Sequence, residues 1–447
     1  MLQDRNKSTG GLLGLGVWVY VLGCRSNLYE GEALAGELER RGAVIFDKPE
    51  GCRAAVIVSC AVTATADKKC RQAVRRARRT VGEEGVVAVC GCWAQGISLN
   101  EARDLGIDIL VGNRLKNALP DSLEESMSRR PAVPVDMRLD LRTDRVWDSL
   151  SLDHPVLRSR AFLKVQEGCD RFCSYCIIPF LRGRSTSRPP EDTLNEARRV
   201  TAAGCSEIVL TGIHLGVYGR DRQTSLAELV RNLSGVPGLR RLRLGSLEPF
   251  ALDEELLDAL AESPVFCPHL HLPFQSGDDE ILARMRRGHT ADDFARLCDQ
   301  ARRKLGDDLH ISGDALVAFP GESEKAFQAT LNLMKRVNLG RVHVFPFSPR
   351  RGTAAASFPD RIPSGVAAER VTAAMELGGD LLGRYASRFV GKTVSVLYGY
   401  TRHFLTFALE SSEPDAVSGC SGEIDGRREI EVRVMGCLEG ELQVCRI

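Results

Sequence analysis

The sequence predicts an α/β protein in three parts: an N-terminal domain on a parallel sheet, a larger parallel barrel and a small C-terminal β-barrel. Three observations support this. Apolar strands alternate with helical stretches over residues 15–144, six strand–turn–helix units follow over residues 155–388, and short alternating strands occupy residues 389–447. Strands separated by helices favour parallel pairing, whereas short strands joined by turns favour a small barrel.

The composition of the 447 residues is that of a soluble globular protein, with 43% apolar and 27% charged residues. The net charge of +1 excludes a global field that would steer the protein to nucleic acid, so RNA contact must come from local basic patches. The fifteen cysteines are odd in number and spread through apolar runs, which favours a reducing compartment. We therefore predict a cytoplasmic protein that has no membrane partner.

Three strands of the N-terminal domain each end at a cysteine. The strands are residues 17–22, 55–59 and 86–90, and the cysteines that follow them are Cys24, Cys60 and Cys92. The carboxyl ends of parallel strands lie at one edge of a sheet, so these thiols can converge although they are far apart in sequence. Chance placement among so many cysteines is the alternative, and Cys90 is the rival of Cys92.

The first of these strands also resembles the signal of a lipoprotein. Arg5 and Lys7 precede an apolar run that ends at Cys24, where a lipid would be attached. The run is too short to span a bilayer. Because two further strands end at cysteines in the same way, we predict a strand here.

A basic helix is predicted at residues 66–80, a few residues after Cys60. Its Lys and Arg side chains include Arg75, Arg76 and Arg79. Most charge runs are solvated faces of a helix. Because this one lies beside a predicted ligand, contact with RNA phosphates is an equally good interpretation.

Residues 131–154 hold prolines and charges without a clear period and are predicted as the linker to the barrel. The barrel strands are predicted at residues 162–166, 207–211, 241–244, 269–272, 310–317 and 341–345. Chemistry in such barrels gathers at the carboxyl ends of the strands. Polar clusters fall at those ends, among them Thr211-Gly212 and Glu248.

The first barrel strand leads into Cys169, Cys173 and Cys176, which are spaced C-x3-C-x2-C. Three cysteines cannot complete a structural zinc site, which needs four ligands. On a four-iron cluster, three thiolates leave one iron open to a small molecule. Half of a zinc site with a distant fourth ligand is the alternative.

With the aromatic Tyr175 before its third cysteine, this stretch resembles the motif of the radical S-adenosylmethionine (SAM) enzymes. Residues 164–185 resemble the methylthiotransferase branch, and most of all the bacterial enzymes that modify threonylcarbamoyladenosine in tRNA. Residues 22–27, 59–63 and 91–95 resemble the three cysteine boxes of that family's N-terminal domain. The last domain resembles its RNA-binding TRAM module, so the resemblance covers nearly the whole chain.

The resemblance implies a partial (β/α)6 barrel, two [4Fe-4S] clusters and SAM. One cluster, which binds SAM, would be held by Cys169, Cys173 and Cys176. The second, which carries sulfur, would be held by Cys24, Cys60 and Cys92. SAM would also contact Thr211, Gly212 and Glu248. The candidate contacts to a tRNA substrate are Arg75, Arg76, Arg79, Arg182, Arg184 and Arg402. An electron donor of the flavodoxin or ferredoxin type and a sulfur donor are the other implied partners.

The implied reaction inserts a methylthio group at C2 of N6-threonylcarbamoyladenosine, at position 37 beside the anticodon. No side chain is predicted as acid or base, because an aromatic C–H bond demands the chemistry of a cofactor. Reductive cleavage of SAM would give a radical that activates C2, and a second SAM would methylate the sulfur. Four alternatives stay open: the same chemistry on isopentenyladenosine in tRNA, the same chemistry on a ribosomal-protein aspartate, a metal-stabilised RNA-binding protein without activity, and the lipoprotein.

Overall fold

The computed structural model describes residues 11–157, 159–409 and 428–447, and the chain divides into two compact units. The first unit takes Met1–Arg158 together with Glu167–Arg171 and Cys176–Thr186, and the second takes the remainder. Arg5 and Lys7 of the lipoprotein alternative lie outside the described residues. None of the helices in the described part of the chain has the length and apolar character needed to cross a membrane.

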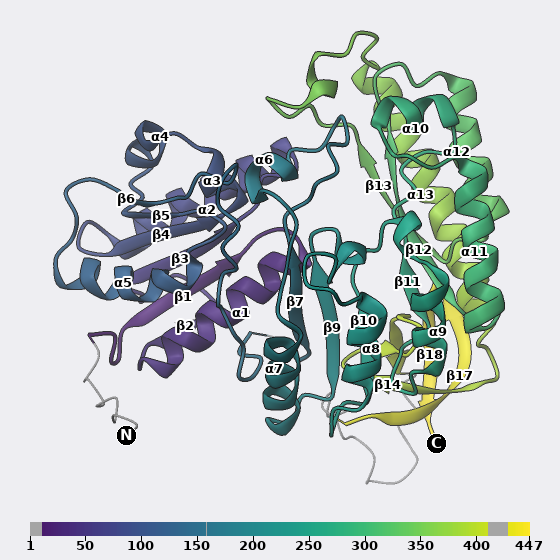
Figure 1. Ribbon diagram of the computed structural model, residues 1–447, viewed down its shortest axis with the longest axis horizontal. Coiled ribbons are helices and arrows are strands. Elements are labelled where there is room, and N and C mark those ends of the chain that lie inside the picture. Colours follow the sequence, from purple (N-terminus) through teal and green to yellow (C-terminus); the bar gives the residue numbers. More distant parts are fainter. Residues whose placement is uncertain (1–10, 158, 410–427) are drawn as a thin grey trace, which may run out of the picture. The chain divides into compact units, whose positions relative to one another are not determined.

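The first unit is built on a six-stranded sheet in the order β2-β1-β3-β4-β5-β6, and every pair is parallel (Figure 1). The strands are β1 (Gly16–Val21), β2 (Val44–Phe46), β3 (Ala54–Ser59), β4 (Val86–Gly91), β5 (Ile109–Val111) and β6 (Val135–Met137). The apolar run before Cys24 is therefore a strand. The chain reverses its direction across the sheet between β1 and β3, and ligands of open α/β sheets bind at such a switch point.

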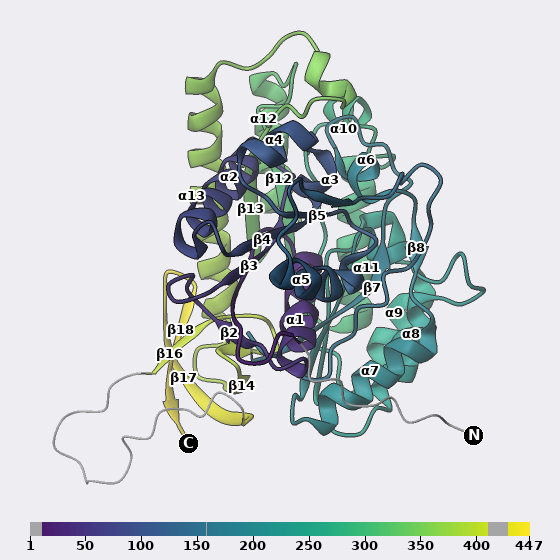
Figure 2. The ribbon, with the colours of Figure 1, turned by 90° about the vertical axis from the view of Figure 1, so that its left-hand side faces the viewer.

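Helices cover both faces of this sheet (Figures 1 and 2). They are α1 (Arg25–Arg40), α2 (Ala64–Val81), α3 (Cys92–Gly96), α4 (Leu99–Asp104), the 3-10 turn η1 (Lys116–Ala118), α5 (Leu119–Ser128) and α6 (Ile178–Arg182). The basic helix α2 begins where the Thr63 side chain accepts a hydrogen bond from the Ala66 amide. It buries Cys70, Val74 and Ala77 in the core, so its arginines lie on the other faces.

The predicted linker is wrong for residues 131–154. They contain β6, which pairs with β5, and Leu150 is buried with its carbonyl accepting a hydrogen bond from Tyr29 Oη (2.6 Å). A three-residue strand is too short to show a period in the sequence. This stretch is therefore part of the first unit.

The second unit contains an open parallel barrel, as predicted. Its strands are β7 (Ala161–Glu167), β8 (Thr186–Ser187), β9 (Glu207–Gly212), β10 (Arg241–Leu244), β11 (His269–His271), β12 (His310–Val317) and β13 (Arg341–Pro346). They form a sheet β10-β9-β7-β8 and a sheet β11-β12-β13, which a bridge between Ser246 and His271 joins. This order leaves β8 and β13 at the two edges, so the barrel is not closed.

Helices follow the barrel strands along the chain and lie outside them (Figure 1). They are α7 (Pro190–Ala202), η2 (Leu215–Val217), α8 (Leu226–Ser234), η3 (Pro249–Ala251), α9 (Glu254–Glu262), α10 (Asp279–Met285), α11 (Ala291–Leu305), α12 (Glu324–Arg336), η4 (Ala354–Ser357) and α13 (Ser364–Ser387). Five of them begin at a side-chain cap that is visible in the sequence: Ser225, Asp253, Asp278, Thr290 and Ser323.

The C-terminal part is a curled five-stranded sheet in the order β15-β14-β17-β18-β16. Its strands are β14 (Thr393–Leu397), β15 (Tyr400–Thr401), β16 (Phe407–Leu409), β17 (Ile430–Leu438) and β18 (Glu441–Arg446). Tyr385, near the end of α13, and Phe389, just after that helix, pack into its apolar core.

Hydrogen bonds from Arg243 of the barrel and from Arg402 of this sheet join the two. Arg243, on β10, donates to the carbonyl of Thr401 (2.8 Å). Arg402 itself donates to the carbonyls of Pro264 (3.2 Å) and Phe266 (2.7 Å). These bonds use Nη2 of a side chain that is partly exposed, so the contact of Arg402 with RNA stays a prediction.

A buried histidine at this joint makes the stability of the protein depend on pH. The Nδ1 of His310 donates to the carbonyl of His403 (2.6 Å), and its ring stacks on Tyr385. Burial lowers the pKa of His310 from 6.5 to about 3. The contribution of the neutral His310 ring to the free energy of unfolding is complete above pH 6.5. It decreases as the pH falls toward 3, because the unfolded chain then binds a proton that the folded chain does not.

At pH 5 we expect His310 to lower the free energy of unfolding by about 2 kcal/mol relative to pH 7. Urea unfolding at both pH values measures this. His310→Asn keeps a donor for His403 but has no titratable ring, so its stability should depend less on pH by the same amount. Equal pH dependence in the two proteins would contradict the prediction.

Candidate functional site

The predicted ligands of the first unit meet at one edge of its sheet. Cys24 caps α1 after β1, Cys60 follows β3, and Cys92 begins α3 after β4. Burial, with a smaller contribution from the charges of Cys92 and Cys24, raises the pKa of Cys60 to about 12. Burial also raises the pKa of Cys92, with a contribution from the charge of Cys24. Each pair of the trio is thus close enough to interact.

Asn27 ties together the strand ends that carry the first two of these cysteines. Its Nδ2 donates to the carbonyls of Leu22 (2.5 Å) and Ser59 (3.0 Å). Gly23 lies against Cys60, since a Cβ at Gly23 would be 2.8 Å from Cys60 Sγ. The Asn27 amide therefore joins the ends of β1 and β3 at the switch point, and the absence of a side chain at Gly23 leaves room for the Cys60 thiol.

The three thiols of this trio suit a four-iron cluster. Thiolates are the ligands of iron–sulfur clusters, and three of them leave one iron open. Cys24 is partly exposed, whereas Cys60 and Cys92 are buried, so the trio has one accessible side. Within the described ranges, no group of three or more His, Cys, Asp or Glu side chains already stands in coordinating geometry. Binding therefore requires the thiols to turn toward a common centre.

Two neighbouring cysteines are placed differently. Cys90, the rival of Cys92, is fully buried, and apart from burial the charges that act on it most are those of Lys116 and Glu30. It points to the opposite face of β4 from Val89, as alternation along a strand demands. Cys70 is buried too, and its Sγ donates to the carbonyl of Cys60 (3.3 Å).

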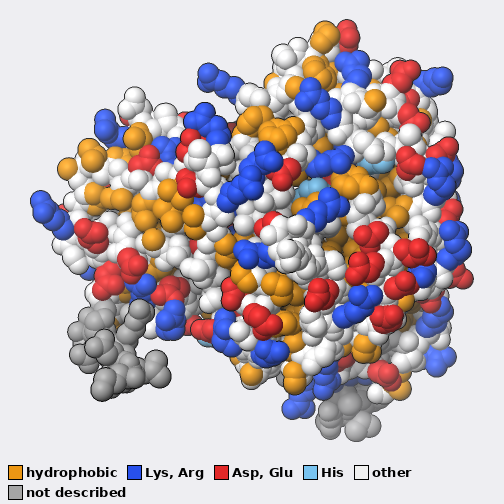
Figure 3. Space-filling model, viewed as in Figure 1, with side chains coloured by type: hydrophobic (Ala, Val, Ile, Leu, Met, Phe, Trp, Pro, Cys, Tyr) orange, Lys and Arg blue, Asp and Glu red, His pale blue; other side chains and the backbone are white. Residues whose placement is uncertain are grey.

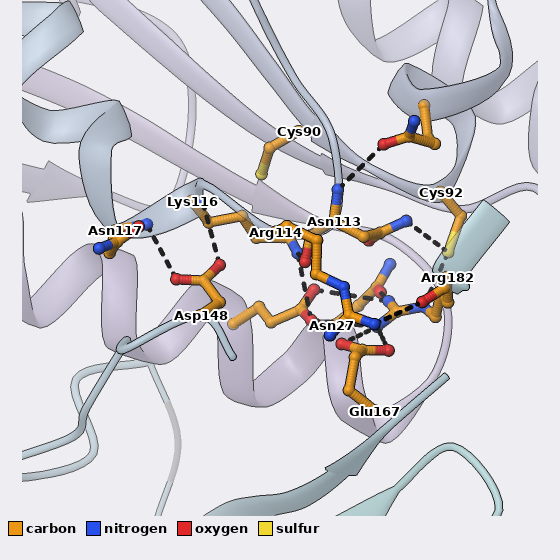
Figure 4. A network of polar contacts seen from close by, with 12 residues as sticks. Asn27, Cys90, Cys92, Asn113, Arg114, Lys116, Asn117, Asp148, Glu167 and Arg182 are labelled. Atoms are coloured by element: carbon orange, nitrogen blue, oxygen red, sulfur yellow. Dashed lines mark hydrogen bonds and ion pairs between the residues drawn. The ribbon is translucent and has the colours of Figure 1, made fainter. Parts of the chain in front are cut away.

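A buried polar network surrounds Cys92, and Arg182 is at its centre (Figure 4). The guanidinium of Arg182 has no exposed surface and donates from Nε to Cys92 Sγ (3.0 Å). It also donates to Asn27, Glu30 and Glu167. This corrects the prediction that Arg182 contacts RNA.

Sequence reasoning missed Asn27, Glu30 and Glu167 as part of the site. Glu30 belongs to α1 and is fully buried, which would be unfavourable without a charged partner. A glutamate among the core-facing residues of an amphipathic helix was the one available signal, but it does not identify the partner.

The C-x3-C-x2-C loop is held by backbone contacts on both sides. The Cys169 amide donates to the carbonyl of Gly183 (2.9 Å), within the first unit. In the second unit, the Ser174 amide donates to Met285 O (3.0 Å), and its hydroxyl donates to Arg284 O (2.8 Å). Cys169, Cys173 and Cys176 are all partly exposed, as an accessible cluster requires.

Arg287 is a further residue of the barrel site that the sequence did not identify. It is buried, its Nη1 lies 3.7 Å from Cys173 Sγ, and it forms an ion pair with Glu248. Glu248, a predicted SAM contact, therefore already has a cationic partner. Thr211 is buried at the carboxyl end of β9, and Gly212 follows it there.

The predicted RNA contacts of α2 lie on the surface. Arg75 and Arg79 line a surface hollow of about 530 Å³ with Arg71, Arg78 and three residues of the α4 region: Glu101, Asp104 and Leu105. Arg76 is paired with Glu50 (2.9 Å). Arg184 is half-exposed and paired with Asp170 (2.5 Å). Acidic and basic side chains are both spread over the face in Figure 3, in keeping with the small net charge.

Two family models match the chain: the radical SAM superfamily over residues 163–334, and the family described as "Uncharacterized protein family UPF0004" over residues 16–112. The chain is 35% identical to a threonylcarbamoyladenosine tRNA methylthiotransferase of Bacillus subtilis, over 88% of this chain and 90% of the relative. It is 37% identical to the enzyme of the same name from Thermotoga maritima, over 85% and 86%. It is 30% identical to a tRNA-2-methylthio-N(6)-dimethylallyladenosine synthase of Maricaulis maris, over 95% and 97%.

A solved structure shares the fold. It is the radical S-adenosylmethionine methyltransferase TsrM of Kitasatospora setae, with cobalamin and a [4Fe-4S] cluster bound. The TM-score is 0.56 and the identity 16%, over 77% of this chain and 74% of that one. At this identity the likeness shows the fold alone.

Proposed function

Because the chain belongs to the radical SAM tRNA methylthiotransferases, we propose that it places a methylthio group on C2 of N6-threonylcarbamoyladenosine, next to the anticodon. One observation carries the choice of substrate. Two relatives named for threonylcarbamoyladenosine are 35% and 37% identical to this chain, whereas three relatives named for dimethylallyladenosine are 30%, 32% and 33% identical.

The cofactors of this enzyme are [4Fe-4S] clusters and SAM. We assign one cluster to Cys169, Cys173 and Cys176. We assign the second to Cys24, Cys60 and Cys92. When bound, the first supplies an electron for the cleavage of SAM and the second supplies sulfur, which is chemistry that side chains lack.

The chain's own residues hold and orient these groups. Asn27 fixes the ends of β1 and β3 from which two cysteines of the sulfur-carrying trio project. Glu248 is held by Arg287 at the carboxyl end of the barrel, where it would contact SAM together with Thr211 and Gly212. A carboxylate that is already oriented loses little entropy when it binds the amino group of a ligand.

Basic residues of α2 would bind the tRNA backbone. Arg75 and Arg79 are exposed, and the hollow that they line lies on the helix that follows Cys60. Salt-dependent phosphate contact positions an RNA without reading its sequence. We also propose that the protein works in the cytoplasm with a separate electron donor and a separate sulfur donor.

The test is anaerobic reconstitution, followed by incubation with SAM, a reductant and tRNA and by mass spectrometry of the nucleosides. Two tRNA preparations are compared, one with threonylcarbamoyladenosine and one with isopentenyladenosine, each without the methylthio group. We expect the added mass of a methylthio group on the first nucleoside. Its appearance on the second alone would assign the other tRNA substrate. A protein that binds zinc and releases no 5′-deoxyadenosine would be a binding protein without activity.

A further inference from the structure

Arg182 contacts Cys92, a predicted cluster ligand, through its Nε, and its other partners are bound by Nη1 and Nη2. Nη1 lies 2.9 Å from Glu167 Oε2 and 3.1 Å from Glu30 Oε1, and Nη2 lies 2.6 Å from Asn27 Oδ1. The remaining nitrogen, Nε, lies 3.0 Å from Cys92 Sγ (Figure 4). The guanidinium is planar, so the other bonds fix the direction of this N–H toward the sulfur.

The charges of the network do not require this contact. Lys116 is buried beside Glu30 (3.4 Å), so Arg182 is not the sole cation for that carboxylate. Arg182 and Lys116 balance Glu30 and Glu167, and a thiolate at Cys92 adds one more negative charge. The N–H of Arg182 is the group placed to stabilise that charge inside the protein.

The same side chain also reaches the loop of the other trio. Glu167 lies two residues before Cys169, and the Gly168 amide donates to Glu167 Oε1 (3.1 Å). Arg182 therefore joins Cys92 to the segment that carries Cys169, and both segments belong to the first unit. Hydrogen bonds to cluster sulfurs raise the reduction potential of a cluster, because they stabilise its more negative reduced form.

We propose that Arg182 is a positioning residue: it orients Cys92 as a ligand and raises the reduction potential of the cluster on Cys24, Cys60 and Cys92. The inference rests on the proposed function, which assigns a cluster to this trio.

The test uses the full chain with Cys169, Cys173 and Cys176 replaced by alanine, so that only the sulfur-carrying trio can load. Arg182→Lys is compared with this parent by iron content and by a redox titration that is followed by electron paramagnetic resonance. Lysine keeps the charge but lacks the planar set of donors, so we expect a lower midpoint potential and an altered signal. Loss of iron from a variant with an unchanged circular dichroism spectrum would support the positioning role as well.

Arg114→Lys is the matched control. Arg114 is buried in the same network but donates to the carbonyls of Val146, Arg182 and Arg184, not to a thiol. Its variant should keep the potential of the parent. An unchanged potential in Arg182→Lys, or equal shifts in both variants, would overturn the inference alone. A parent that loads no iron would overturn the cluster assignment and the inference with it.

Because Arg182→Lys can disturb folding, Arg182→Gln is measured beside it. Glutamine is shorter and uncharged, and thermal unfolding reports whether either variant is folded. If both variants are unfolded, Arg182 acts in holding the fold and not in tuning the cluster, and that outcome overturns the inference.

Discussion

Replacing Cys24, Cys60 and Cys92 together by alanine should abolish the methylthio product and leave the cleavage of SAM. The proposed SAM-binding cluster lies on other cysteines, so 5′-deoxyadenosine should still be released. Iron should fall from about eight to about four per chain, since each trio holds one four-iron cluster. Nucleoside mass spectrometry, 5′-deoxyadenosine analysis and iron determination measure the three quantities on one preparation.

The complementary variant replaces Cys169, Cys173 and Cys176. It should also keep about four irons, but it should lose both the product and the release of 5′-deoxyadenosine. Cys298→Ala is the control, because this thiol is buried in α11 and belongs to neither trio. If the first variant still forms product or keeps all of its iron, the assignment of a second cluster to Cys24, Cys60 and Cys92 is wrong.

The convergence of that trio could be predicted from the sequence because it follows from a rule of topology. Strands β3 and β4 are buried at every residue, so they read as unbroken apolar runs that end at a cysteine. The choice of Cys92 over Cys90 came from the resemblance of residues 91–95 to a cysteine box of the family, and the structure adds that Cys90 is fully buried and feels the charges of Lys116 and Glu30. Residues two apart in a strand share a face, but β4 ends at Gly91 and Cys92 begins α3, so strand alternation does not relate the two thiols.

The polar residues behind the trio could not be predicted. Arg182 and Glu30 are 152 positions apart, and no local period links them. An arginine in a basic loop reads as exposed, because buried arginines are rare unless they are paired. Arg287 was missed for the same reason, since its partner Glu248 is 39 positions away. Barrel strands such as β10 and β12 were found at their observed positions, whereas the three-residue strand β6 was not.

The second large effect is expected for Gly168→Ala, in the residue before Cys169. Gly168 has φ +72°, which an L side chain rarely adopts. A Cβ there would lie 2.1 Å from the Arg184 carbonyl oxygen and 2.6 Å from that of Gly183. These are backbone atoms and cannot rotate away as a side chain would. The loop would have to open, and the hydrogen bond from the Cys169 amide to Gly183 (2.9 Å) would break.

We expect the positive φ to cost about 1–2 kcal/mol and the collision to add about 1–3 kcal/mol to the loss of unfolding free energy. The cluster on Cys169, Cys173 and Cys176 should fail to load, so iron should fall to about four per chain and 5′-deoxyadenosine should not form. Urea unfolding, iron determination and a SAM cleavage assay give the three results.

Gly51→Ala separates backbone strain from collision. Gly51 lies in the same unit with φ +85°, and a Cβ there meets no atom within 4 Å. Its free energy of unfolding should fall only by the cost of the positive φ, about 1–2 kcal/mol, and the variant should keep its iron and its SAM cleavage. The close packing of Gly168 on residues 183–184 would then be what holds Cys169 in place. If Gly168→Ala behaves like Gly51→Ala in all three measurements, that packing does not position the ligand, and the loop can take up a Cβ by moving as a whole.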